Sequence, residues 1–140
     1  MPIVMEYIRK PDFLNVTWTG DLTSVELFDV NAQLTRLHTE EGASRFLIDL
    51  SAIERISATA VDILRLPAIE YFKAHVNRDL LRVAVVKPPS SEAEDLIKFY
   101  VTACLNRGWM VKMLPDPRVA IEWLALEQCF QQQGDPVDAN

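Results

Sequence analysis

Hydroxyl and carboxylate side chains gather in one stretch of the sequence. Asp49 and Ser51 close a short apolar run, and Ser57, Thr59 and Asp62 follow soon after it. A hydroxyl next to a carboxylate can act as a nucleophile, accept a phosphate or cap a helix. The chemistry of these residues therefore depends on the elements that position them.

A strand followed by a helix is predicted around these residues. Phe46–Leu50 is an almost continuous apolar run, which is typical of a strand covered on both faces. Small residues follow at Ser57–Ala60, and apolar residues then recur at helical spacing, at Val61, Leu64 and Ala68. A helix should begin at this turn. Because the start of a helix has free N–H groups and the positive end of its dipole, we expect ligand or partner contacts there.

The first part of the chain predicts a hairpin and a helix. Val4–Arg9 and Leu14–Thr19 flank a Pro-Asp turn, and their apolar and polar residues suit two antiparallel strands. Gly20–Asp21 is expected to end the second strand. Thr23–Glu26 has the spacing of a capping box, and an apolar stripe follows at steps of three and four up to Gly42. This pattern predicts an amphipathic helix that stops at the glycine.

The second part of the chain alternates strands with helices. Leu80–Val86 and Trp109–Leu114 are β-rich runs, and Ser91–Glu94 between them has capping-box spacing ahead of a clear helical stripe. Asp116–Pro117 suits the cap and first position of a last helix. Pro67 should kink or break the helix that begins near Ser57.

The predicted order is ββαβαβαβα, which indicates an α/β fold. A leading hairpin followed by alternating strands and helices implies a mixed sheet with parallel central strands joined by right-handed crossovers. No linker divides the sequence, so we expect a single domain over residues 1–126. Residues 127–140 are polar and contain Gly and Pro, and this tail is expected to be frayed.

Composition excludes several classes of function. The formal charge of -6 and the pI near 4.9 repel nucleic acid and anionic membranes. No apolar run approaches the roughly 20 residues that span a bilayer, and the first residues do not resemble a signal peptide, so we expect a cytoplasmic protein. Cys104 and Cys129 lie far apart and form no metal-binding pattern, so both should be free thiols.

No catalytic or metal-binding constellation is evident. His38 and His75 lack the neighbouring ligands of a zinc site, and none of the glycine-rich phosphate loops occurs, so no cofactor is expected. A hydrolase that used Asp49, Ser51 and His75 is the least favoured alternative.

The element order and several segments resemble the STAS domains of anti-sigma factor antagonists, and in particular short SpoIIAA-like proteins. The segments that carry this resemblance are Phe46–Ser51, Ile56, Ser57–Ala60, Arg82–Val86 and Ala120–Leu124. The resemblance covers roughly Val4 to Leu126. It implies the STAS/SEC14-like fold and a regulatory role through protein partners.

In the antagonists that this chain resembles, the turn reads Asp-Ser-Ser-Gly and its first serine is phosphorylated by a partner kinase. Ser57 here stands for the aspartate, Ala58 for the phosphorylated serine, Thr59 for the second serine and Ala60 for the glycine. Because Ala58 has no hydroxyl, the phosphorylation switch implied by the resemblance cannot operate there. The hydroxyls of Ser57 and Thr59 are expected to cap the helix rather than to accept phosphate.

The sequence thus predicts a non-enzymatic STAS-like interaction module that binds a protein partner and can form a homodimer. The predicted contact residues at the strand end and helix start are Asp49, Ser51, Ser57, Ala58, Thr59 and Asp62. The alternative is the binding of a lipid or small apolar molecule in a SEC14-like pocket. For that alternative Pro67 would supply a hinge, and the lining would come from aromatic residues, namely Trp18, Trp109, Trp123, Phe99 and Tyr100.

Overall fold

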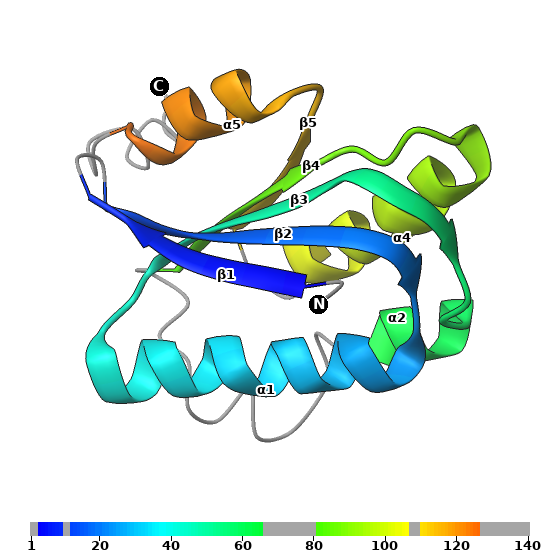
Figure 1. The fold of residues 1–140 in the computed structure, drawn as a ribbon, viewed down its shortest axis with the longest axis horizontal. Coiled ribbons are helices and arrows are strands. Elements are labelled where there is room, and N and C mark those ends of the chain that lie inside the picture. The colour runs from blue at the N-terminus through cyan, green and yellow to red at the C-terminus, as the bar shows by residue number, and fades with distance from the viewer. Residues whose placement is uncertain (1–2, 10–11, 66–80, 107–109, 127–140) are drawn as a thin grey trace.

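The computed structural model describes residues 3–9, 12–65, 81–106 and 110–126 (Figure 1). Its elements follow the predicted order. They are β1 (Ile3–Ile8), β2 (Phe13–Leu22), α1 (Ser24–Glu41), β3 (Arg45–Ile56), α2 (Ala60–Arg65), β4 (Arg82–Val86), α4 (Ser91–Asn106), β5 (Met110–Leu114) and α5 (Pro117–Leu124). The predictions for Pro67, His75, Trp109, Cys129 and the tail 127–140 lie outside the described residues.

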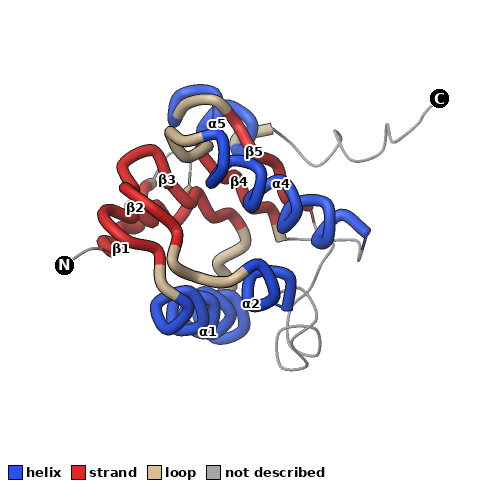
Figure 2. Tube along the Cα trace, turned by 90° about the vertical axis from the view of Figure 1, so that its right-hand side faces the viewer, coloured by secondary structure: helices blue, strands red, loops and turns tan. Residues whose placement is uncertain are grey.

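The strands form one mixed sheet in the order β1-β2-β3-β4-β5. β1 pairs antiparallel with β2, and every other neighbouring pair is parallel. This confirms the predicted fold class. Successive crossovers that share one hand and step in one direction place their helices on the same face. Accordingly α1, α2 and α4 pack on one face of the sheet, whereas α5 packs on the other (Figures 1 and 2).

Side-chain alternation along the strands divides the interior into two cores. In β2, Leu14, Val16 and Trp18 are buried toward α1, while the polar residues between them are partly exposed, as predicted. In β3, Phe46 faces the same core and Leu47 faces α5. The smaller core beneath α5 consists of Phe13, Leu47, Ala84, Val86, Leu114, Ala120, Trp123 and Leu124.

Three predicted helix ends are confirmed by their capping contacts. The side chain of Thr23 accepts a hydrogen bond from the backbone N of Glu26 at 3.2 Å and so starts α1. Gly42 ends α1 in the left-handed region with φ 77°, which glycine adopts without steric cost. Asp116 caps α5 by accepting from Val119 N at 3.0 Å.

The predicted start of α4 and the predicted end of β2 are wrong. The cap of α4 is Ser90 rather than Ser91, because Ser90 Oγ accepts from Ala93 N at 3.1 Å. β2 does not end at Gly20, which has a φ of 76°, but continues to Leu22. The ladder between β2 and β3 shifts register on both sides of this glycine, so Gly20 lies in an irregularity of the strand and does not terminate it.

β3 is longer than predicted. It runs from Arg45 to Ile56, whereas the apolar pattern predicted a strand that ended near Leu50. The second half of β3 is mostly exposed and polar, so its sequence looks like a loop, but it pairs with the extended end of β2 through Asp21–Arg55 and Leu22–Ile56. Backbone pairing between distant segments therefore sets this boundary.

Candidate functional site

The loop between β3 and α2 is held by Asp21 at the end of β2. Ser57 Oγ donates a hydrogen bond to Asp21 Oδ2 at 2.6 Å, and Ser57 N donates to Asp21 Oδ1 at 3.1 Å. Arg55 Nε lies 3.3 Å from Asp21 Oδ2. The hydrogen bond from the Ser57 hydroxyl, with a smaller contribution from Arg55, lowers the pKa of Asp21 below its ordinary value of 3.8. At neutral pH the Ser57 hydroxyl therefore donates to an ionised carboxylate and closes the loop.

Ala58, at the position that the resemblance aligned with a phosphorylated serine, is buried. Its side chain is 4% exposed and belongs to the core under α1, and its backbone N donates to Leu22 O at 3.0 Å. This position lacks a hydroxyl and is also shielded from solvent. Ala58 is therefore not part of the exposed contact surface that was predicted around it.

Thr59 and Asp62 hold the start of α2 against α1. Thr59 Oγ1 accepts from Asp62 N at 3.1 Å, which is the helix-capping role expected for this hydroxyl. Ser24 Oγ, at the first residue of α1, donates to Asp62 Oδ2 at 2.6 Å. The first turns of the two helices are therefore joined by a side-chain hydrogen bond.

Two exposed valines lie beside this junction. Val25 in α1 is 79% exposed and Val61 in α2 is 64% exposed. The prediction that Val61 lies on the buried stripe of its helix is wrong, because Ile63 occupies the core position. The sequence-based prediction did not include Val25. An apolar residue that lies outside the apolar stripe beginning at Leu27 could have been recognised as exposed.

Asp49 and Ser51 do not lie with the other predicted contact residues. Both are within β3 and not at its end, and by strand alternation they share the face of Leu47, opposite α1. Ser51 donates to Asp49 Oδ1 through its hydroxyl at 2.7 Å and its backbone N at 3.0 Å. The predicted site therefore separates into a sheet-face pair and a helix-start group.

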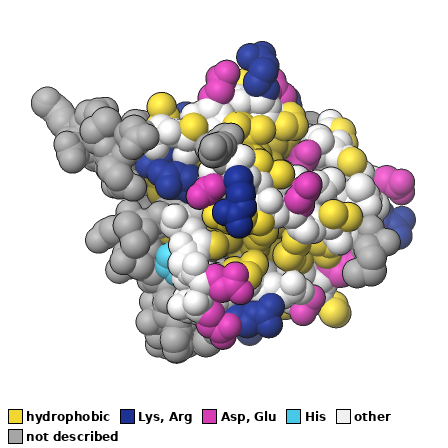
Figure 3. All heavy atoms as spheres, turned by 60° about the vertical axis from the view of Figure 1, so that its left-hand side comes forward, with side chains coloured by type: hydrophobic (Ala, Val, Ile, Leu, Met, Phe, Trp, Pro, Cys, Tyr) yellow, Lys and Arg dark blue, Asp and Glu magenta, His cyan; other side chains and the backbone are white. Residues whose placement is uncertain are grey.

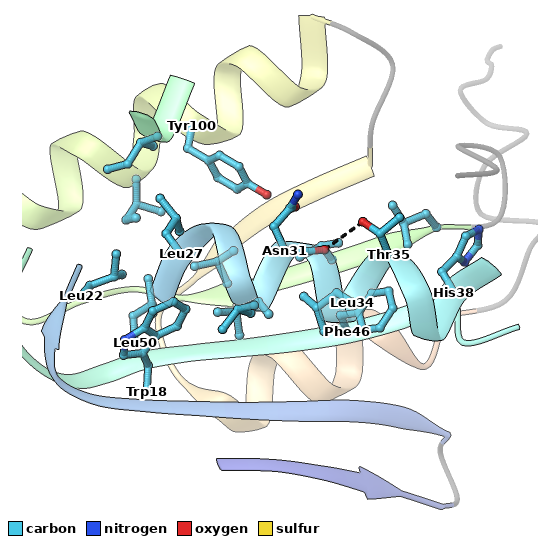
Figure 4. Close-up of a pocket in the computed structure, with 17 residues that line it drawn as sticks. Trp18, Leu22, Leu27, Asn31, Leu34, Thr35, His38, Phe46, Leu50 and Tyr100 are labelled. Atoms are coloured by element: carbon cyan, nitrogen blue, oxygen red, sulfur yellow. Dashed lines mark hydrogen bonds between the residues drawn. The ribbon is translucent and has the colours of Figure 1, made fainter. Parts of the chain in front are cut away.

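A cavity of about 90 Å³ lies between the sheet and α1 (Figure 4). Two of the aromatic residues predicted as a lining, Trp18 and Tyr100, do line it, whereas Phe99 is exposed and Trp123 belongs to the opposite core. The other lining residues are Leu22, Leu27, Val30, Asn31, Leu34, Thr35, His38, Phe46, Ile48, Leu50, Ile63, Leu81, Val83, Val85 and Ile97.

The polar groups of the cavity are few and belong mainly to α1 and α4. Burial raises the pKa of Tyr100 well above its ordinary value of 10.0, and Cys104 contributes in the same direction, so the hydroxyl stays protonated. His38 Nδ1 lies 2.6 Å from Ala43 O and donates to it. Thr35 Oγ1 donates to Asn31 O at 2.8 Å. No carboxylate, ammonium or guanidinium group is among the described lining residues.

The described part of the chain contains no cluster of metal ligands and no helix suited to cross a membrane. Among these residues no three His, Cys, Asp or Glu side chains stand together in a way that could hold a metal ion. None of the described helices combines the length and apolar character needed to cross a membrane. Because His75 is outside the described residues, the hydrolase alternative stays a sequence-based hypothesis.

No protein-family model and no curated protein matches the sequence. Solved structures do match the fold. An uncharacterised DUF3478-family protein with a SpoIIAA-like fold from Shewanella loihica is 21% identical over 88% of this chain and 92% of its own, with a TM-score of 0.51.

Two further similar structures are anti-sigma factor antagonists. SpoIIAA in its unphosphorylated form is 10% identical, with a TM-score of 0.56 over 86% of this chain and 96% of its own. An antagonist from Mycobacterium paratuberculosis is 17% identical, with a TM-score of 0.54 over 87% of this chain and 93% of its own. The chain therefore has a SpoIIAA-like fold, as the resemblance in sequence predicted.

Proposed function

We propose that the chain is a non-enzymatic, STAS-like regulatory module that binds a protein partner at the start of α2 and does not use a serine phosphorylation switch. The surface we assign to the partner, called here the helix-start surface, consists of the exposed residues Val25, Ser57, Thr59, Ala60 and Val61. The observation that carries the proposal is the exposure of Val25 and Val61, which are the sequence neighbours of Ser24 and Asp62 in the two helices that the Ser24–Asp62 hydrogen bond joins.

The geometry of this surface favours docking on physical grounds. Burying an exposed valine side chain in an interface contributes at most about 1.5–3 kcal/mol. The surrounding backbone is already fixed by the contacts of Ser57 with Asp21 and of Thr59 with Asp62. A partner would therefore gain apolar contact area without the entropic cost of ordering a loop.

The similar structures support the first part of this proposal, a regulatory module, and the burial of Ala58 supports the second part, the absence of a phosphorylation switch. Two similar structures are anti-sigma factor antagonists, which supports a regulatory module at the level of the fold. The buried methyl group of Ala58 supports the absence of the switch that SpoIIAA-like regulators are expected to use. Intact-mass analysis of the protein from its native cells should show no phosphorylated form, and phosphate on Ser57 or Thr59 would contradict this half.

Exposed hydrophobic side chains also occur elsewhere, which provides a matched control. Figure 3 shows them across the middle of one face with charged side chains around them, and Val4 on β1 is 55% exposed. A photo-crosslinking residue placed at position 61 should give a discrete adduct with one protein in the native cell. The same residue at position 4 should not give that adduct. Equal labelling from both positions would remove the helix-start surface from consideration.

Binding to the crosslinked partner can then be measured with purified proteins. Val61→Asp should weaken binding at least tenfold, because the interface would have to bury a charge in place of a valine. Val4→Asp should leave the dissociation constant unchanged. Both variants should retain the thermal stability of the wild type, since both sites are exposed.

The cavity of about 90 Å³ favours a second candidate function, the binding of a small apolar molecule. Its lining is almost entirely aliphatic and aromatic, with a few polar groups, which is the usual composition of a small-molecule site. Saturable binding of a hydrocarbon to the cavity in solution would support this function. Failure of any such compound to bind would exclude it and leave the protein-docking proposal intact.

A further inference from the structure

β1 forms one edge of the sheet, and no described strand pairs with its outer side. Its residues Ile3–Ile8 pair with β2 in unbroken register, so the backbone N–H and C=O groups of alternate residues point outward at the regular spacing of a ladder. Such an edge is a template for a further strand. In Figure 2 β1 lies at the outer margin of the sheet, and α1 lies beneath the sheet without extending past that margin.

The two edges of the sheet differ in how they are protected. β5 carries the exposed Lys112 at its centre, and both α4 and α5 contact it. A lysine on an edge strand opposes pairing with another strand. β1 contains no Lys, Arg or Pro, no bulge interrupts its ladder, and its one charged residue is Glu6. β1 is therefore the edge that is open to a further strand.

Apolar side chains flank the free edge of β1 on both faces of the sheet. Ile3 and Met5 pack against the core under α1, whereas Ile8 packs against the core under α5. By strand alternation Tyr7, which is 47% exposed, lies on the α1 face, and Val4, which is 55% exposed, lies on the α5 face. Figure 3 looks toward this side of the molecule and shows hydrophobic side chains across its middle. A strand added to β1 would therefore gain apolar contacts on both faces.

Symmetry restricts how two copies of β1 can pair. Directly opposite side chains of antiparallel strands lie on the same face, so a two-fold axis perpendicular to the sheet places one residue opposite its own counterpart. An axis at Met5 pairs the five residues Ile3–Tyr7 of each copy. An axis at Glu6 pairs the five residues Val4–Ile8 but sets two carboxylates directly opposite each other, which is destabilising. An axis at any other residue of β1 pairs three residues or fewer.

We propose that the chain forms a symmetric homodimer in which the β1 strands of two copies pair antiparallel about a two-fold axis at Met5 and join the two sheets into one. A second copy suits this edge because each chain has a formal charge of -6, and β1 brings a single carboxylate into the contact. In this register Glu6 faces Val4 of the second copy, and the two Glu6 side chains are diagonal neighbours about 7–8 Å apart. Pairing of β1 with itself closes the assembly, whereas pairing of β1 with β5 would continue into a filament and would bring Lys112 into the contact.

Charges introduced at position 4 test both the dimer and its register. Sedimentation equilibrium of the full chain should show a reversible monomer–dimer equilibrium. Val4→Asp sets a second carboxylate opposite each Glu6 and should raise the dissociation constant of the dimer at least tenfold, whereas Val4→Lys sets an ammonium there and should lower it about threefold. With the axis at Glu6, position 4 would face Ile8 and both substitutions would weaken the dimer. Leu105→Asp, at an exposed position of α4, should leave the dissociation constant unchanged.

Amide hydrogen exchange identifies the strand that forms the contact. In the wild type, every second amide of Ile3–Tyr7 should become protected as the protein concentration rises. In Val4→Asp these amides should exchange as they do in the dilute wild type. Dilute samples of the variants should melt at the wild-type temperature, because the substituted positions are exposed.

Several results would overturn the proposed dimer. A wild type that stays monomeric at the highest attainable concentration would do so, as would a dimer that Val4→Asp does not weaken. Equal weakening by Val4→Asp and Val4→Lys would rule out the axis at Met5. Protection of the β1 amides that appears only when another protein is added would mean that β1 accepts a strand of that protein instead of a second copy.

Discussion

On one face of the sheet α5 is the one described helix that packs against β3, β4 and β5, whereas on the other face α1, α2 and α4 leave a cavity of about 90 Å³ (Figure 1). The α5 face is held by directional polar contacts as well as by its core. The opposite face combines apolar packing with side-chain hydrogen bonds at one edge, those of Ser57 with Asp21 and of Ser24 with Asp62. The helix α5 and the cavity therefore lie on opposite faces of the same strands.

Two arginines at the starts of adjacent strands hold the end of α5. Arg82 is 1% exposed, and its Nη1 donates to Leu126 O at 2.7 Å, while its guanidinium lies 5.6 Å from the centre of the Trp123 ring. Arg45 Nε donates to Leu124 O at 2.6 Å. The last carbonyl groups of a helix have no partners within the helix, and cations are favoured beside them. The α5 face is thereby closed by contacts that depend on accurate geometry.

The largest expected effect is at Arg82. Arg82→Met keeps most of the apolar stem but removes the charged donor of the 2.7 Å hydrogen bond to Leu126 O and the cation beside the Trp123 ring. It should lower the free energy of unfolding by about 3 kcal/mol, measured by urea titration. Arg118→Met, on the exposed side of α5 where Arg118 pairs with Glu122 at 3.8 Å, should change it by less than ~0.5 kcal/mol.

The same variant sharpens the comparison between the two faces. Arg82→Met should leave the affinity of the cavity for a small apolar compound unchanged under conditions where the variant is folded, because Arg82 does not line the cavity. Equal losses of stability for Arg82→Met and Arg118→Met would mean that the contacts at the end of α5 contribute little. The α5 face would then be held mainly by its apolar core.

A smaller effect is expected where the helix-start loop meets the core. Ala58→Leu adds volume at a position that is 4% exposed and should lower the free energy of unfolding by about 2 kcal/mol. Ala60→Leu, at an exposed position two residues later, should change it by less than ~0.5 kcal/mol. An unchanged free energy of unfolding in Ala58→Leu would mean that the core around position 58 has room for a larger side chain. The loop would then not be held rigidly by this core, and the helix-start surface would lose the rigidity on which the docking proposal depends.

Local signals in the sequence predicted much of the fold. The caps at Thr23 and Asp116 and the stop at Gly42 are formed by residues that lie close together in the chain, so their spacing identified them. The alternation of β2 and the order of the elements were likewise correct, because each depends on a short window.

Contacts between distant segments could not be predicted in this way. Ser57 meets Asp21 across 36 positions of sequence, and the polar end of β3 is a strand because of its pairing with β2. The separation of Asp49 and Ser51 from the helix-start surface follows from the same error about the end of β3. The cavity depends on how three helices pack on the sheet, and no single residue pattern encodes that arrangement.

The smallest expected effect concerns the polar contact that joins β2 to the helix-start loop. The pKa of Asp21 is lowered mainly by the Ser57 hydroxyl and secondarily by Arg55, so it lies below the value of 3.8 expected in the unfolded chain. The unfolded state therefore binds a proton more readily, and the contribution of Asp21 to stability is present above about pH 4 and is lost as the pH falls through the lower, folded-state pKa.

Melting temperatures of the wild type and three variants between neutral and strongly acidic pH would measure this contribution. Asp21→Asn should remove the part of the acid-induced decrease that arises from this residue. Ser57→Ala should reduce the part of the acid-induced decrease in melting temperature that arises from Asp21 more than Arg55→Ala does, because the hydroxyl is the larger cause of the pKa shift. A wild-type acid profile in Asp21→Asn would show that the Asp21–Ser57 contact does not hold the loop in solution. The cavity face would then have fewer polar contacts than the structure shows, and the difference between the two faces of the sheet would be greater.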